Sequence, residues 1–132
     1  MRVSKQLIWA TLAGLAALFL WKRGGAAAGG ITVDVRTLPV LNEGGPWQAW
    51  TLVTNTTAST RTVYASISGD VGGIVLSFTP STAALTVPSG GTLAISDFWF
   101  YIPAGTIGLS GQVTVVVDGA TDTATFTVEA LA

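Results

Sequence analysis

The chain has 132 residues, enough for one domain of ordinary size and one short appendage. Only 10% of its residues are charged, against roughly 25% in soluble domains, and it contains no Cys and no His. These features exclude disulfide frameworks, zinc sites and nucleophile systems of the Ser-His or Cys-His type, and we expect no cofactor.

The charges are divided unevenly along the chain. All charged side chains of the first 30 residues are cationic: Arg2, Lys5, Lys22 and Arg23. The remaining residues carry two cationic and seven acidic side chains, so the net charge of −1 combines a basic segment with an acidic body. We expect no nucleic-acid partner, because nucleic-acid binding depends on Lys and Arg that neutralise phosphates.

Residues 1–23 are predicted to form a hydrophobic anchor helix with membrane lipid as its partner. The uncharged run from Leu7 to Trp21 would span about 22 Å as a helix, against about 30 Å for the hydrocarbon core of a bilayer. Lys5 and Lys22 can extend toward the headgroups and so help a short span to cross. The side chains expected in lipid are Leu7, Ile8, Trp9, Leu12, Leu15, Leu18, Phe19, Leu20 and Trp21.

Two other interpretations of this segment remain open. A basic start, an apolar run and the small residues before Gly29 also fit a cleaved secretory signal peptide, which would make the protein secreted. A soluble partner helix is the third interpretation. Lys22 and Arg23 favour the uncleaved anchor, because cations directly after an apolar run act as a stop-transfer flank, and we expect the acidic body outside the membrane.

Small residues form a stripe along the expected helix, and a slack segment follows it. Such stripes let membrane helices approach closely, although alanine-rich apolar filler gives the same pattern. The stripe consists of Ala10, Ala13, Gly14 and Ala17. Residues 24–30 contain only Gly and Ala and are predicted to form a flexible tether of roughly 15 Å reach.

From Ile31 onward the apolar residues alternate with a period of two, as in half-buried strands. Turn residues separate the runs, and Asp118-Gly119 predicts a tight hairpin because both residues tolerate positive φ. Strands are expected at 31–36, 47–55, 60–68, 74–78, 84–87, 92–102, 112–117 and 121–128. The expected core members are Val33, Val35, Leu52, Val63, Ile67, Phe78, Leu85, Val87, Leu93, Ile95, Val113, Val115, Phe126 and Val128. Residues 31–132 are therefore predicted to be an all-β, antiparallel sandwich of about seven or eight strands.

Several motifs of this body resemble the immunoglobulin-like modules of the CARDB and NEW3 type, which occur in bacterial and archaeal surface proteins. They are VTNTT (53–57), TVYASISG (62–69), FTPSTAALTVPSGGT (78–92), YIPAGTIG (101–108) and VTVVVDGATDTATFTV (113–128). The resemblance covers nearly all of residues 31–132 and implies an immunoglobulin-like fold. It implies little about function, because such modules serve as spacers, adhesive units and assembly subunits. Thr57, where Gly is usual, and the aromatic stretch 96–100 depart from the pattern.

Aromatic residues supply the candidate interface: Trp47, Trp50, Phe98, Trp99, Phe100 and Tyr101. Consecutive strand residues face opposite ways, so Phe98 and Phe100 share one face and Trp99 and Tyr101 share the other, while Trp47 and Trp50 lie on opposite faces. One pair can enter the core, and the other needs a cover. A protein contact, carbohydrate stacking and structural cover by a β-bulge near Asp97 or by the tether are the alternatives.

Other motifs carry little chemistry. Asn55-Thr56-Thr57 matches the glycosylation acceptor pattern, but Asn at a strand end is more often a turn residue. Asp118 and Asp122 have no calcium-loop spacing, and a sandwich of this size rarely forms the deep cleft that a carboxylate pair needs for catalysis. We expect no metal site and no enzymatic activity.

The sequence favours a structural subunit, anchored to a membrane or particle and built into a repeated surface assembly with copies of itself or other structural proteins. A virion shell of a membrane-containing virus, a pilus-like filament and a surface layer all fit this plan. The alternative is a glycan-binding or adhesion module, either secreted or anchored, whose N-terminus is cleaved as a signal peptide.

Overall fold

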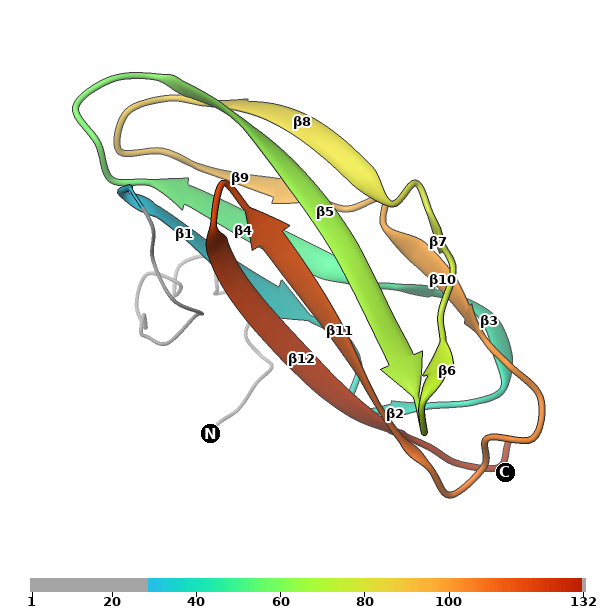
Figure 1. Ribbon diagram of the computed structural model, residues 1–132. Coiled ribbons are helices and arrows are strands. Elements are labelled where there is room, and N and C mark those ends of the chain that lie inside the picture. The colour runs from blue at the N-terminus through green and yellow to red at the C-terminus, as the bar shows by residue number, and fades with distance from the viewer. Residues whose placement is uncertain (1–28, 132) are drawn as a thin grey trace.

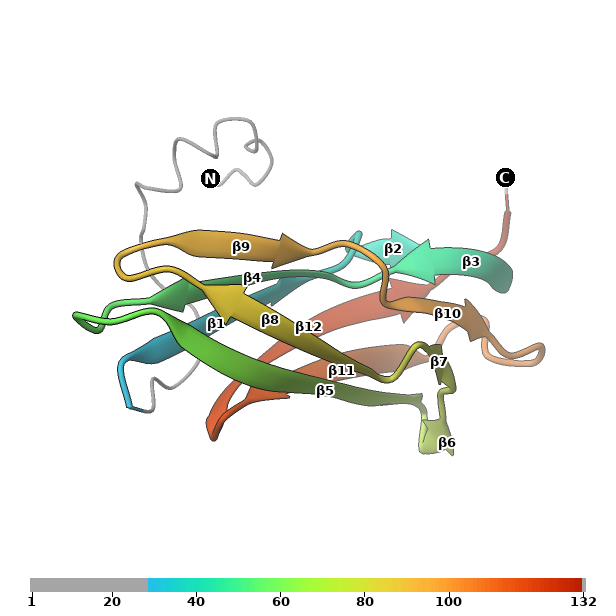
Figure 2. The ribbon, with the colours of Figure 1, turned by 90° about the horizontal axis from the view of Figure 1, so that it is seen from above.

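The computed structural model describes residues 29–131, which form a β-sandwich of two layers (Figures 1 and 2). The predicted anchor helix and most of the predicted tether lie outside the described residues. Residues 29–131 contain no helix, and therefore none that could cross a membrane. The prediction of an all-β body is confirmed.

One layer consists of two small antiparallel sheets placed end to end (Figure 2). The first has the order β1-β4-β9, with β1 (Ile31–Arg36), β4 (Trp50–Asn55) and β9 (Thr92–Ile95). The second has the order β3-β10-β7, with β3 (Gly44–Gln48), β10 (Trp99–Ile102) and β7 (Phe78–Thr79).

The other layer is a single larger sheet with the order β2-β12-β11-β5-β6, in which β8 also pairs with β5. All pairs are antiparallel except the parallel pair of β2 and β12. The strands are β2 (Val40–Leu41), β12 (Ala120–Val128), β11 (Ser110–Val117), β5 (Arg61–Val71), β6 (Ile74–Val75) and β8 (Thr82–Val87).

The core lies between the layers and follows the expected alternation. On β5, Val63, Ala65 and Ile67 are buried, while the residues between them are exposed. Most of the predicted core residues are buried, and Phe78 and Leu85 pack partly buried against them. Leu52 and Leu93 are corrections. Leu52 lies on the outer face of β4, because Thr51, Val53 and Asn55 turn inward, and Leu93 is 37% exposed because β9 is the outermost strand of its sheet.

Two strands predicted as continuous are interrupted. The predicted strand 47–55 is split into β3 and β4 at the buried residue Ala49, whose N–H donates to the carbonyl of Phe98. The predicted strand 92–102 is split into β9 and β10 at residues 96–98. In both cases the two fragments belong to different sheets: β4 and β9 pair in one, and β3 and β10 pair in the other. This layer therefore consists of two short sheets.

The predicted hairpin is confirmed. Asp118 and Gly119 have φ values of 48° and 91°, and Val117 is opposite Ala120 at the start of the β11–β12 pair. Both central residues of the turn therefore adopt positive φ, as a two-residue hairpin with the native strand twist requires.

The described chain starts and ends at opposite ends of the sandwich (Figure 1). Gly29 and Gly30, expected at the end of the tether, instead form a turn fixed to the domain. The carbonyl of Gly30 accepts hydrogen bonds from the N–H and the hydroxyl of Thr56, at 2.8 and 2.9 Å. The positive φ of Gly30, +80°, and its close approach to the Thr57 side chain leave no room for a Cβ atom. The start of the described chain is therefore fixed to this end of the sandwich.

Candidate functional site

The aromatic stretch 98–101 divides between the core and the surface. Phe98 and Phe100 are buried, whereas Trp99 is 39% and Tyr101 is 61% exposed. The ring of Phe100 contacts the rings of Phe78 and Phe126, with centroids 5.1 and 6.1 Å apart. Phe98 and Phe100 are therefore core residues, which corrects their assignment as interface candidates. Phe98 is the last residue of the break at residues 96–98, and this break turns both rings toward the core.

Three tryptophans from separate strands line one groove of about 510 Å³ on the layer that contains β1, β3 and β10. Trp50 at the start of β4 is the cross-strand partner of Arg36, and Trp99 is the partner of Gln48. Directly opposed residues lie on the same face, so these four side chains belong to the outer face. The lining residues are Arg36, Thr37, Leu38, Leu41, Pro46, Trp47, Gln48, Trp50 and Trp99. We name this surface the tryptophan groove.

Trp47 reaches the tryptophan groove from the other side of its strand. It is the partner of the buried Phe100, so it faces the core, and the prediction that Trp47 and Trp50 lie on opposite faces is confirmed. Both residues nevertheless line the groove, because β3 is the outer strand of its sheet and the segment from Arg36 to Leu41 lies beside it. The Trp47 Nε1–H donates to the carbonyl of Asn42 at 2.9 Å, which fixes the orientation of the indole.

Polar groups surround the aromatic rings of the groove. The Arg36 guanidinium donates to both carboxylate oxygens of Asp34, with a shortest N–O distance of 2.8 Å, so its charge is matched by its neighbour. The Gln48 Nε2 donates to the carbonyl of Ser96, which leaves its amide oxygen as an acceptor. Within residues 29–131, the buried hydroxyl of Thr37 has no hydrogen-bond partner. The groove thus combines aromatic surface with hydrogen-bonding groups and no uncompensated charge.

A second surface, at the end of the sandwich opposite Gly29, was not predicted from the sequence. Exposed apolar side chains occur on β6 and on the loop before β11: Ile74, Val75, Ile107 and Leu109. Leu109 lies beside Gly72, where an added Cβ would be 2.7 Å from its side chain, so the two loops are in contact. We name this surface the apolar end. The sequence gave no sign of this surface, because Gly72 and Leu109 are distant along the chain.

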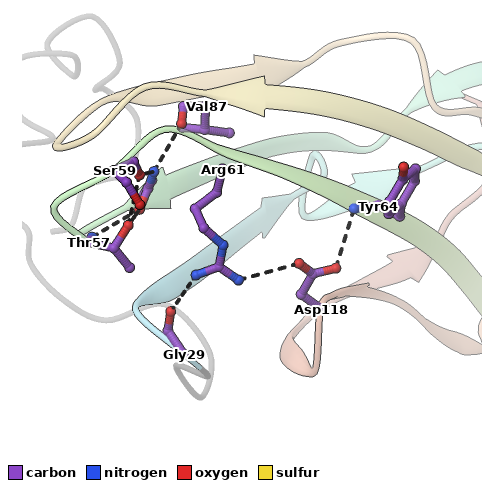
Figure 3. A network of polar contacts seen from close by, with 8 residues as sticks. Gly29, Thr57, Ser59, Arg61, Tyr64, Val87 and Asp118 are labelled. Carbon is purple, nitrogen blue, oxygen red and sulfur yellow. Dashed lines mark hydrogen bonds and ion pairs between the residues drawn. The ribbon is translucent and has the colours of Figure 1, made fainter.

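Asn55 is a buried turn residue, and the turn interpretation of Asn55-Thr56-Thr57 is confirmed. Its Nδ2 donates to the carbonyls of Ser59 and Val87, each at 2.9 Å, and its Oδ1 accepts from the N–H and the hydroxyl of Thr57. Figure 3 shows Thr57, Ser59 and Val87 around this point. Since the amide is buried and fully bonded, it is closed to a modifying enzyme in the folded domain.

The same end of the sandwich carries an ion pair between Arg61 and Asp118. Arg61 donates to the carbonyl of Gly29 at 2.9 Å, and its Nη2 lies 3.7 Å from Asp118 Oδ2 (Figure 3). The other oxygen of Asp118 accepts from the N–H of Tyr64. Arg61 therefore links the first described residue to the β11–β12 hairpin.

The acidic side chains do not converge. No group of three or more acidic side chains that could hold a metal ion occurs among residues 29–131. Asp122 is buried, and its Oδ2 accepts from the N–H of Val35 at 2.9 Å, on the edge of β1 that faces away from β4. This carboxylate thereby connects the two layers and covers a strand edge.

The predicted anchor residues and the small-residue stripe lie outside the described residues, so their roles stay predictions. The interface role of Trp47, Trp50, Trp99 and Tyr101 also stays a prediction, although the structure now brings the three tryptophans to one groove.

No family model matches the sequence, and no curated protein matches it. Among solved structures, the chain is similar to the CARDB domain of a Pyrococcus furiosus protein in complex with di-metal ions, with 13% identity and a TM-score of 0.51. The match covers 76% of this chain and 87% of that domain.

Two enzymes contain a similar part. The alkylpurine DNA glycosylase AlkC of Pseudomonas fluorescens, bound to DNA containing an abasic site analog, matches with 16% identity and a TM-score of 0.58. A β-glucosidase of Listeria innocua in complex with gluconolactone matches with 8% identity and a TM-score of 0.51. Each match covers 76% of this chain, which corresponds to only 31% of the glycosylase chain and 16% of the glucosidase chain.

These identities carry information about the fold alone. The resemblance read from the sequence motifs is confirmed at that level: residues 29–131 have the immunoglobulin-like β-sandwich fold of a CARDB-type module.

Proposed function

We propose that this chain is a non-enzymatic structural subunit of a repeated surface assembly. Its apolar N-terminal segment holds it to a membrane or particle, and the sandwich projects outward and packs against copies of itself or other structural proteins. A virion shell, a pilus-like filament and a surface layer are all compatible with this plan.

The observation that carries the proposal is that the first described residue and the apolar end lie at opposite ends of the sandwich. The chain enters at Gly29, which Arg61 and Thr56 hold in place through the turn at Gly29-Gly30. The apolar end lies at the opposite end, with Val75 80% and Ile107 53% exposed. Since monomeric proteins rarely gather exposed apolar side chains, this arrangement suits a module that is held at one end and makes contacts at the other.

The full chain, extracted from its native membrane in detergent, provides the test. We expect it to stay with the membrane in high salt, and to sediment in detergent as an assembly larger than a monomer. Replacing Val75 and Ile107 together by Asp should reduce the assembly to monomers, while Tyr64→Asp, at an exposed position near the start of β5 and away from the apolar end, should leave it intact. A wild-type protein that is monomeric at every concentration, or a native N-terminus at Gly29, would contradict the proposal.

A further inference from the structure

We infer that the tryptophan groove binds a neutral carbohydrate of the glucan class. This inference goes beyond the structural function and does not depend on it, since the groove belongs to the sandwich whether or not residues 1–28 are retained. It rests on the shape of the groove, its aromatic surface and its hydrogen-bonding groups.

The shape of the groove suits a small ring better than a protein surface. Its volume of about 510 Å³ is within the range of small-molecule sites, roughly 300–1,000 Å³. A stable protein contact buries about 1,200–2,000 Å² in total, a much larger area than one concave site provides. A ligand of one to a few sugar rings therefore fits the site.

The aromatic surface provides the stacking. Indole faces are electron-rich, and the axial C–H bonds of a sugar ring with equatorial hydroxyls present a flat, weakly positive face to them. Trp99 is the most exposed of the three rings at 39%, and Trp47 and Trp50 lie partly buried beside it. The bond from Trp47 to Asn42 holds one ring in place before binding, which lowers the entropic cost of forming the complex.

The polar lining selects a neutral, hydroxyl-rich ligand. Gln48 brings an amide group and Arg36 a guanidinium to the lining of the groove, and Asp34 balances the charge of Arg36. Because the charge of Arg36 is already matched by Asp34, the groove has no excess cation to attract an acidic glycan. The chemistry of the lining therefore favours glucose-type chains over charged polysaccharides.

The test uses the full chain in a detergent without a sugar headgroup, titrated by calorimetry with cellohexaose, laminarihexaose and maltohexaose. We expect saturable binding of at least one of the three hexasaccharides. Trp99→Ala and Trp50→Ala should each lower the affinity at least tenfold, and Trp99→Phe should restore part of it. Tyr101→Ala is the matched control, because Tyr101 is exposed on the same strand and does not line the groove, and it should change the affinity less than twofold.

Thermal unfolding of each variant checks that the fold is retained. Absence of saturable binding for all three sugars would overturn the inference, as would equal losses in Trp99→Ala and Tyr101→Ala. Sedimentation distinguishes the main competitor: if Trp99→Ala abolishes self-association while no sugar binds, the groove is a protein contact and the carbohydrate assignment is wrong.

Discussion

Asn55 offers the sharpest test of how this sandwich is held together. Its side chain has 0% exposure and makes four hydrogen bonds, two as donor to Ser59 and Val87 and two as acceptor from Thr57. Asn55→Ala removes all four, at a net cost of about 0.5–1.5 kcal/mol each, and leaves buried partners without water to replace the amide. Because part of the loop can rehydrate, we expect a loss of about 3 kcal/mol in the free energy of unfolding.

The loss should appear as a fall of about 12–24 °C in the thermal midpoint of the full chain, since 1 kcal/mol corresponds to roughly 4–8 °C in a domain of this size. Asn55→Asp should be at least as damaging, because a carboxylate would face the carbonyl oxygens of Ser59 and Val87 in place of two N–H donors. Asn42→Ala is the matched control: its amide makes one exposed hydrogen bond to the carbonyl of Glu129, so its cost should stay below about 1 kcal/mol.

A double-mutant cycle with Thr57→Ala refines the result. Both residues share the bond between the Thr57 hydroxyl and Asn55 Oδ1, which is 2.6 Å long, so their effects should be less than additive by about 0.5–1.5 kcal/mol. A fall of less than 3 °C for Asn55→Ala, or equal effects of Asn55→Ala and Asn42→Ala, would refute the argument that this amide holds the β4–β5 connection.

Three further changes test other parts of the chain. Gly119→Val should cost about 2 kcal/mol in urea unfolding, because a β-branched residue at a φ of 91° is strained, whereas Gly119→Asn should cost less. Asp122→Ala should cost about 1–3 kcal/mol by leaving the N–H of Val35 buried without its acceptor, and Asp122→Asn, which keeps an acceptor oxygen, should cost less in the same assay. Lys22→Ala with Arg23→Ala should raise cleavage after Ala28, detected by mass spectrometry of the native protein; an unchanged mass would argue against these cations as the boundary of an anchor.

Local patterns were sufficient to predict most strands and the β11–β12 hairpin. Alternation of apolar and polar residues with a period of two is typical of strands. Asp118-Gly119 predicts the hairpin because both residues tolerate the positive φ that a two-residue turn requires. The phase of a strand is harder to predict. Thr51 and Asn55 turn inward on β4 although they are polar, so the pattern favoured the wrong face for Leu52. Their burial depends on partners far along the chain, such as the carbonyl of Val87 for Asn55.

The two surfaces were less predictable than the strands, because each joins residues that are distant in the sequence. The apolar end brings the β5–β6 turn against the loop before β11, and no local pattern links Gly72 to Leu109. The tryptophan groove likewise needs the segment from Arg36 to Leu41 beside β3. Sequence reasoning identified the aromatic residues as unusual, but it could not tell which of them would meet.

The break at residues 96–98 decides that question. In an uninterrupted strand, Ile95 would share its face with Trp99 and Tyr101, so the burial of Ile95 would draw both into the core and leave Phe98 and Phe100 outside. The break shifts the alternation by one residue, so Ile95, Phe98 and Phe100 are all buried and Trp99 turns outward beside Gln48. The shift buries two phenylalanines, which have no polar atoms, and leaves the indole N–H and the phenol hydroxyl within reach of solvent or a ligand. The candidate site thus arises from the same step that completes the core.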